Sequence, residues 1–224
     1  MNKITTKRVT ITIAFISFLS SMNAHAFKDS RDDKWAFFLS PQFTNSKTLE
    51  FGNGSKAEIN DRSSIAFGFG YNINPYIELT TQFATSSSNY SGTRIIDDGS
   101  DTPEKFSANL YTSSINFGVT YNLLHKPFTP YISANFGSTY IDSGIPTGDL
   151  TNVCWWDPWW GYVCSPRAQT YTSTEFNYGA GAGLRYDFNR KLYIKGGVNL
   201  NVIDISSSNT ADFTTYQFTF GFMF

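Results

Sequence analysis

The chain has 224 residues, of which 17% are aromatic, and its 17 basic and 18 acidic residues leave a formal net charge of −1. This balance argues against a nucleic-acid-binding protein, because binding to phosphates favours an excess of Lys and Arg on one face. A chain of this length without an obvious linker fits a single domain, but the aromatic share is unusual for a globular one.

The first 26 residues have the organisation of an export signal peptide. Three basic residues precede an apolar run at residues 9–19, and an Ala-His-Ala sequence follows at residues 24–26. The apolar run is shorter than the roughly 18 to 20 residues of a membrane-spanning helix. We therefore predict cleavage after Ala26 and a single mature domain at residues 27–224, with 14 basic residues, 18 acidic ones and a net charge of −4.

Eight segments of the mature chain alternate between apolar and polar or small side chains, which is the period of a strand with two different faces. In the second segment, for example, Ile65, Phe67 and Phe69 alternate with small residues. Such segments suit tilted strands that cross a membrane. The eight segments lie at residues 34–43, 64–71, 77–83, 114–121, 130–140, 175–186, 192–200 and 216–224.

The connections between these segments alternate between short and long. The short ones lie at residues 72–75, 122–129 and 188–190, and the longer ones at 44–60, 86–105, 141–169 and 204–211. A barrel with turns at one rim and loops at the other gives this alternation. We predict an all-β fold, an eight-stranded antiparallel up-and-down transmembrane β-barrel. Both termini are then periplasmic and the long loops extracellular.

Periodicity alone does not tell whether the apolar face points outward into lipid or inward, as in a soluble barrel. Glycines such as Gly68, Gly70 and Gly181 lie on the polar face, where a narrow lumen needs little volume. Aromatic residues gather near the segment ends, as in the aromatic girdles of membrane barrels. The membrane barrel is the preferred interpretation. A soluble calyx with an inward-facing aromatic pocket for an apolar ligand is the third alternative.

The last segment ends the chain on alternating aromatic residues. With this strand and the eight-segment rhythm, the mature sequence resembles the small outer-membrane β-barrel proteins, the OmpA-like and OmpX-like group that includes Opa-type and Ail-type surface proteins. The resemblance implies a Gram-negative outer membrane, contact with its lipid and lipopolysaccharide, and recognition of the last strand by the barrel-assembly machinery. The residues that would carry this assembly signal are Tyr216, Phe218, Phe220, Phe222 and Phe224.

Both cysteines and four of the five tryptophans lie within residues 154–164. In an exported chain such a pair predicts a disulfide between Cys154 and Cys164, which in the chain-entropy model stabilises the closed loop by about 3 kcal/mol. Neither a histidine nor a third cysteine accompanies the pair, which disfavours a metal site. Asp157 and the Pro after it predict a turn, with the two tryptophan pairs facing each other across a hairpin.

This tryptophan-rich segment has two interpretations. It either packs on itself as a cap over the barrel mouth, or it presents a contact surface to a host-surface molecule, a glycan or a lipid headgroup. Indole rings suit the second role because they combine a large apolar area with a polar N–H group. The candidate contact residues are Trp155, Trp156, Trp159, Trp160 and Tyr162.

Five charged residues fall on the polar face of the predicted strands, and therefore in the lumen. They are Glu78, Glu175, Arg185, Asp187 and Lys195. Charges in a narrow lumen must pair to offset desolvation, so a network that fills the barrel is expected. A narrow channel lined by these residues is the alternative function, although eight strands leave an interior that side chains nearly fill.

Neither catalysis nor metal binding is expected. The mature chain keeps one histidine, His125, in a short turn at the rim away from the outer leaflet. The acidic residues Asp97, Asp98, Asp101 and Glu104 lack calcium-loop spacing and are expected to be solvated. We therefore expect a monomer without a cofactor that binds no nucleic acid and has a structural or surface-interaction, adhesin-like role.

Overall fold

The computed structural model describes residues 31–50, 56–95, 103–205 and 209–224, so the predicted signal peptide at residues 1–26 lies outside the described residues. Within these ranges no helix has the length and apolarity that crossing a membrane would require. The described strands are β1 (Lys34–Thr44), β2 (Lys47–Glu50), β3 (Lys56–Ile59), β4 (Arg62–Asn72), β5 (Ile77–Ile95), β6 (Pro103–Asn122), β7 (Phe128–Asp157), β8 (Gly161–Asp187), β9 (Leu192–Ile205) and β10 (Asn209–Met223).

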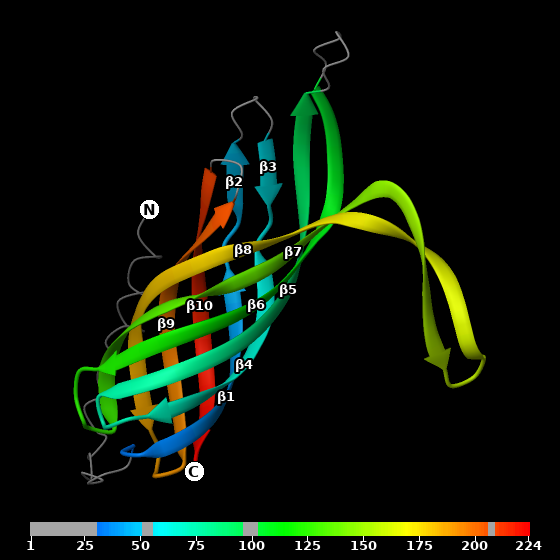
Figure 1. The fold of residues 1–224 in the computed structure, drawn as a ribbon. Coiled ribbons are helices and arrows are strands. Elements are labelled where there is room, and N and C mark those ends of the chain that lie inside the picture. Colours follow the sequence, from blue (N-terminus) through cyan, green and yellow to red (C-terminus); the bar gives the residue numbers. More distant parts are fainter. Residues whose placement is uncertain (1–30, 51–55, 96–102, 206–208) are drawn as a thin grey trace, which may run out of the picture.

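Eight long strands form a closed ring (Figure 1). Each of them pairs antiparallel with its neighbours along the chain, and β1 closes the ring by pairing with β10. The short strands β2 and β3 form a hairpin beyond the ends of β1 and β4, and β3 pairs with β5. The predicted eight-stranded up-and-down barrel is therefore confirmed.

The apolar face of the ring points outward. On β4, Ile65, Phe67 and Phe69 are exposed, whereas Ala66 between them is fully buried. Aromatic residues also pair on the outer surface, where the Phe67 and Phe83 rings stack with centroids 5.5 Å apart. A soluble calyx would hold these rings inside the barrel. That alternative is therefore wrong, because the aromatic face is the lipid-facing one.

The long connections were predicted as loops, but most of their described residues belong to strands. β5 continues to Ile95, and β6 begins at Pro103. In the same way β7 continues to Asp157, and β8 begins at Gly161. These extensions carry Ser, Thr and Asn on both faces, because beyond the apolar belt neither face has to meet lipid. Figure 1 shows the hairpins at one end of the barrel and the short turns at the other.

Candidate functional site

A cluster of ion pairs fills the barrel at the short-turn end. Arg185 donates from Nη1 to Glu78 Oε2 at 2.9 Å and from Nε to Asp187 Oδ1 at 2.8 Å. Lys195 Nζ donates to the same Glu78 oxygen at 2.5 Å. The centroid of the Tyr193 ring lies 4.2 Å from the Arg185 guanidinium carbon. Arg185 and Glu78 are fully buried, so their mutual pairing offsets the loss of hydration.

Arg31 belongs to this cluster and was missed from the sequence. Its Nε donates to Asp187 Oδ2 at 2.5 Å, and its side chain is 99% buried. The remaining guanidinium nitrogens donate to three carbonyls on two different turns, those of Pro75, Leu124 and Lys126. Arg31 precedes the first strand and follows no periodic pattern. Only the excess of carboxylates over cations among the predicted lumen residues hinted at a further cation.

Glu175 does not lie in this cluster. It is buried on the inner face of β8, as predicted, but ten residues before Arg185. At about 3.3 Å per residue, the two positions are roughly 33 Å apart along the strand. The prediction of a single network that includes Glu175 is therefore wrong, because alternation identifies the face of a strand and not the height along it.

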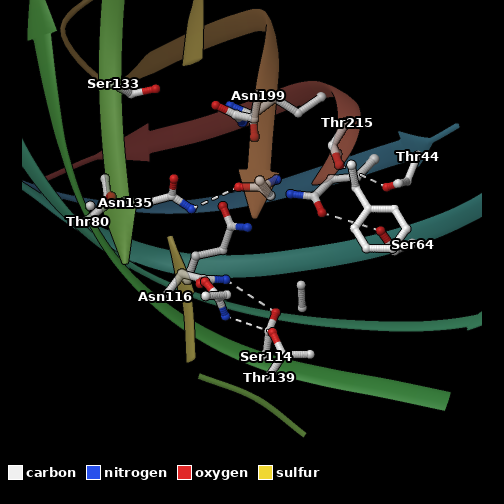
Figure 2. A pocket seen from close by; sticks show the side chains of 18 of the residues that line it. Thr44, Ser64, Thr80, Ser114, Asn116, Ser133, Asn135, Thr139, Asn199 and Thr215 are labelled. Carbon is white, nitrogen blue, oxygen red and sulfur yellow. Dashed lines mark hydrogen bonds between the residues drawn. The ribbon is translucent and has the colours of Figure 1, made fainter. Parts of the chain in front are cut away.

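A polar cavity of about 160 Å³ lies in the barrel, on the side of the ion pairs away from the short turns, with Lys195 in its lining (Figure 2). Hydroxyl and carboxamide side chains dominate the lining, and several are bonded to one another along the inner wall, such as Asn135 Nδ2 of β7 to Asn201 Oδ1 of β9 at 3.3 Å. Within the described lining there is no Asp, Glu, His or Cys. The cavity therefore offers hydrogen bonds but few groups suited to acid–base or nucleophilic chemistry.

An apolar cluster fills the barrel interior toward the opposite end. Its buried members are Ile59, Tyr90, Ile203, Ala211 and Phe213. The guanidinium of Arg62, which also lines the cavity, lies 4.8 Å from the Phe213 ring centre. The polar cavity thus lies between two packed layers, one charged and one apolar.

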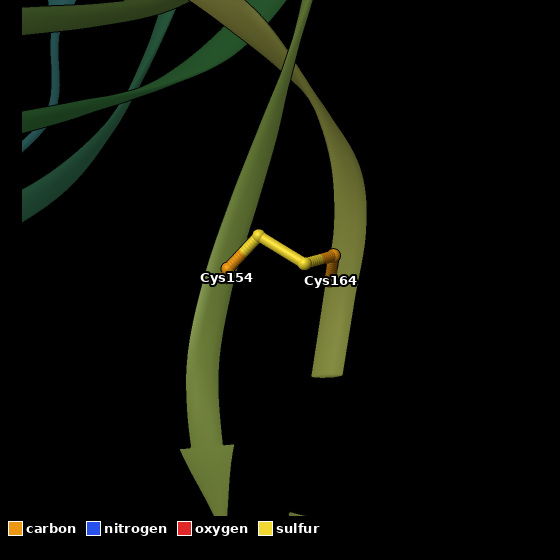
Figure 3. Close-up of a disulfide and its surroundings, with 2 residues drawn as sticks. All are labelled: Cys154 and Cys164. Carbon is orange, nitrogen blue, oxygen red and sulfur yellow. A yellow bond between two sulfur atoms is a disulfide. The ribbon is translucent and has the colours of Figure 1, made fainter. Parts of the chain in front are cut away.

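The tryptophan-rich segment forms the tip of the β7–β8 hairpin. Cys154 and Cys164 occupy opposing positions of the ladder and form a disulfide (Figure 3). The ladder continues to Asp157, whose Oδ1 accepts hydrogen bonds from the backbone N–H groups of Trp159 and Trp160 at 2.8 and 2.9 Å. The predicted turn is present, closed by a carboxylate.

The two tryptophan pairs do not face each other, contrary to the prediction. Trp155 lies opposite Val163 and Trp156 opposite Tyr162, while Trp159 and Trp160 occupy the turn itself. The reason is that the turn takes up residues 158–160, which leaves no strand position for the second pair.

The tryptophans do not form a cap over the barrel mouth. Trp159 is 89% exposed, Trp160 81%, Trp156 74% and Tyr162 70%. Figure 1 shows the hairpin leaving the barrel rim and extending to one side of it. Of the two interpretations from the sequence, the self-packed cap is excluded, and the exposed aromatic tip is the candidate contact surface.

The other candidates occupy different places. Tyr216, Phe218, Phe220, Phe222 and Phe224 point outward on and just beyond β10. His125 lies in the exposed β6–β7 turn, 3.4 Å from the Tyr76 hydroxyl. Asp97, Asp98 and Asp101 lie outside the described residues, as does the Glu104 side chain. Across the described part of the chain, no three His, Cys, Asp or Glu side chains form a group suited to a metal ion.

Comparison with known proteins places this geometry in a family. Two solved structures with similar folds are those of Ail, the attachment invasion locus protein of Yersinia pestis, in complex with the heparin analogue sucrose octasulfate, and of the outer membrane protein OprG from Pseudomonas aeruginosa. Ail has a TM-score of 0.50 and 10% identity, covering 86% of this chain and 99% of Ail. OprG has a TM-score of 0.50 and 10% identity, covering 87% of this chain and 97% of OprG.

At this identity the two structures show a shared fold and nothing finer. No curated protein sequence matches the chain. The family model for the outer membrane protein beta-barrel domain, however, matches residues 11–224. The chain therefore belongs to this family of outer-membrane β-barrels.

Proposed function

We propose that this protein is a closed outer-membrane barrel that holds an aromatic hairpin at the cell surface and uses its tip to contact another molecule, an adhesin-like role. The observation that carries the proposal is the exposure of Trp156, Trp159, Trp160 and Tyr162 together at one tip. Large aromatic side chains gathered in this way are costly in water, and such patches mark contact sites.

The disulfide supports this role. Cys154 and Cys164 close the hairpin just behind the aromatic tip, and the Asp157 carboxylate fixes the turn in front of them. A tip held in one conformation loses little conformational freedom when it binds, which favours affinity. The contact residues are therefore ordered before a partner arrives.

We also propose an orientation in the membrane, which is supported by the difference between the two rims. The first strand begins and the last strand ends at the short-turn end, where Ala36 pairs with Met223. We assign this rim to the periplasm and the hairpins to the outside, with residues 1–26 removed as a signal peptide and the aromatic residues from Tyr216 to Phe224 read by the assembly machinery. The barrel is proposed to act as a monomer.

A conducting channel is the less favoured function, because packed layers lie on both sides of the central cavity. The ion pairs around Arg185 fill one end, and the cluster around Tyr90 and Phe213 fills the other. Single-channel recording in planar bilayers is expected to show no reproducible open steps. Regular open steps would favour the channel over the contact role.

The contact role is tested by replacing Trp155, Trp156, Trp159 and Trp160 with Ala. Binding of the parent protein and of this variant is compared on host cells, on a panel of neutral glycans and on phosphatidylcholine bilayers. Binding to at least one of the three is expected to fall. The heat-modifiable electrophoretic migration, which reports a folded barrel, should stay unchanged. Equal binding of the two proteins to all three would remove the hairpin from the function.

A further inference from the structure

The β7–β8 hairpin is attached to the barrel rim at its base, so the barrel sets the direction in which it leaves. The Tyr90 hydroxyl, which is part of the apolar cluster inside the barrel, donates to the Ser143 carbonyl at 3.0 Å. Ile145 packs against the same cluster. The base at residues 143–145 is therefore fixed, and the part beyond it, residues 150–168, is called the distal arm here.

Two irregularities bend the ribbon between the base and the distal arm. The pairing with β8 shifts between Asp142 and Pro146 and again between Pro146 and Leu150. Gly144 and Gly148 lie within these shifts at φ of 63° and 91°, a conformation that glycine adopts without strain. In Figure 1 the hairpin arches away from the rim, and its tip descends on the outside, clear of the barrel wall.

Aromatic side chains lie on both faces of the tip and at its turn. Strand alternation places Trp156 on the face of the hairpin that carries Tyr162 and the disulfide, and Trp155 on the opposite face with Val163. Trp159 and Trp160 extend from the turn. A rigid macromolecule would cover one of these faces and leave the others in water, whereas a fluid layer of lipid headgroups contacts all of them.

The tip carries aromatic rings and no cation, which suits the boundary between acyl chains and headgroups and leaves no basic side chain to bind a phosphate. Between Cys154 and Cys164 there is no Lys, Arg or His, and the one carboxylate, Asp157, accepts two backbone hydrogen bonds within the turn. The polar groups that remain are indole N–H groups and the Tyr162 hydroxyl. Trp and Tyr with this balance of apolar ring and polar tip concentrate at membrane–water interfaces.

We infer that the distal arm turns back onto the membrane that holds the barrel, and that its aromatic tip lies at the boundary between the acyl chains and the headgroups of the outer leaflet. The inference rests on the proposed contact role of the hairpin and names its partner as lipid, so of the three binding targets above only the phosphatidylcholine bilayer should lose binding in the alanine variant. The tip then anchors the arm beside the barrel, in the same interfacial zone as the aromatic residues at the ends of the strands.

The sequence supplies a convenient reporter for this placement. Trp35 is the only tryptophan outside the hairpin, and it lies exposed on the outer face of β1. A Trp35→Phe variant therefore emits only from the distal arm. A variant with all four hairpin tryptophans changed to Phe emits only from Trp35 and serves as the matched control for the barrel wall. Heat-modifiable migration establishes that both variants fold.

The experiment places each variant in phosphatidylcholine nanodiscs, with bromine either on the acyl carbons nearest the glycerol or near the chain ends. Emission from Trp35→Phe is expected to fall strongly with the shallow bromines and little with the deep ones, and aqueous iodide should have little effect. A Gly148→Val change, which strains the bend without a steric clash, should weaken the shallow quenching.

Three outcomes would overturn the inference. Iodide quenching of the arm without bromine quenching would place the tip in water. Quenching only by brominated vesicles added to unbrominated nanodiscs would place it on an apposed membrane. Unchanged quenching by the shallow bromines in Gly148→Val would mean that the bend does not place the tip in the membrane. The proposed contact role can survive failure of the inference. It stands if the tip is found in water and the replacement of the four tryptophans by Ala still reduces binding to cells or glycans.

Discussion

The barrel wall and the distal arm are both antiparallel ladders, but they are stabilised in different ways. Each strand of the ring has a neighbour on both sides, with an apolar face toward lipid and a polar face toward a packed lumen. In the arm β7 and β8 have only each other, and both faces are open. A lone two-stranded hairpin is marginally stable in water. The disulfide between Cys154 and Cys164 supplies the constraint that closure supplies in the barrel.

The largest effect is expected where the barrel interior loses a central charge. Arg185→Ala removes the partner of Glu78 and Asp187 in a fully buried site, so the free energy of unfolding should fall by about 3 to 5 kcal/mol. Urea unfolding in lipid vesicles, followed by heat-modifiable migration, measures this loss. A loss below 1 kcal/mol would mean that the ion pairs contribute little to the barrel.

A smaller loss is expected for Arg31→Ala, about 2 to 3 kcal/mol, because charge-assisted hydrogen bonds to Asp187 and to the turn carbonyls disappear. Asp187 keeps its bond to Arg185, and the vacated rim can take up water. The same unfolding measurement applies. An Arg31→Lys variant is the control, and it should recover part of the stability through its charge but not the forked geometry.

Removal of the disulfide should affect the arm and leave the barrel unchanged. The double change Cys154→Ser and Cys164→Ser releases a constraint of about 3 kcal/mol on the hairpin. Chymotrypsin should then cleave much faster at the aromatic residues of the distal arm, while urea unfolding of the barrel moves by less than about 0.5 kcal/mol. A comparable drop in barrel stability would show that the two regions unfold together.

The smallest effect is expected for an exposed ion pair. The hydrogen bond from Lys47 to Asp212, 2.7 Å long, holds the pKa of the Asp212 carboxyl below its usual value. The contribution of this ion pair to the free energy of unfolding is present above the ordinary carboxyl pKa. It is lost as the pH falls through the lowered pKa of Asp212. Lys47→Ala should reduce the free energy of unfolding by less than about 1 kcal/mol at neutral pH and by nothing in acid. A larger loss would point to an unrecognised role for Lys47.

The ring of strands could be predicted because lipid imposes an apolar face on every span, and that face repeats with period two in the sequence. The extensions were missed for the same reason. Residues such as Ser86, Ser87 and Ser88 belong to β5, yet they carry no apolar alternation, because above the membrane the ladder hydrogen bonds hold the strands without it.

The candidate site was predicted in its composition and not in its arrangement. The disulfide followed from the spacing of Cys154 and Cys164, but the sequence did not reveal which residues the turn consumes, and so paired the tryptophans wrongly. Arg31 had no pattern around it at all. Its place depends on the closed barrel bringing two turns and the end of β8 within reach of one side chain.

The shifted pairing between Asp142 and Leu150 also bears on how the protein can diversify. The contacts of Ser143 and Ile145 with the rim lie before the second shift in pairing. The distal arm, residues 150–168, is therefore joined to the barrel only through the two strands of the hairpin. Substitutions or length changes within residues 150–168 should leave the pairing of the ring unchanged. We expect that the arm can therefore be exchanged for an unrelated peptide while the barrel keeps its architecture.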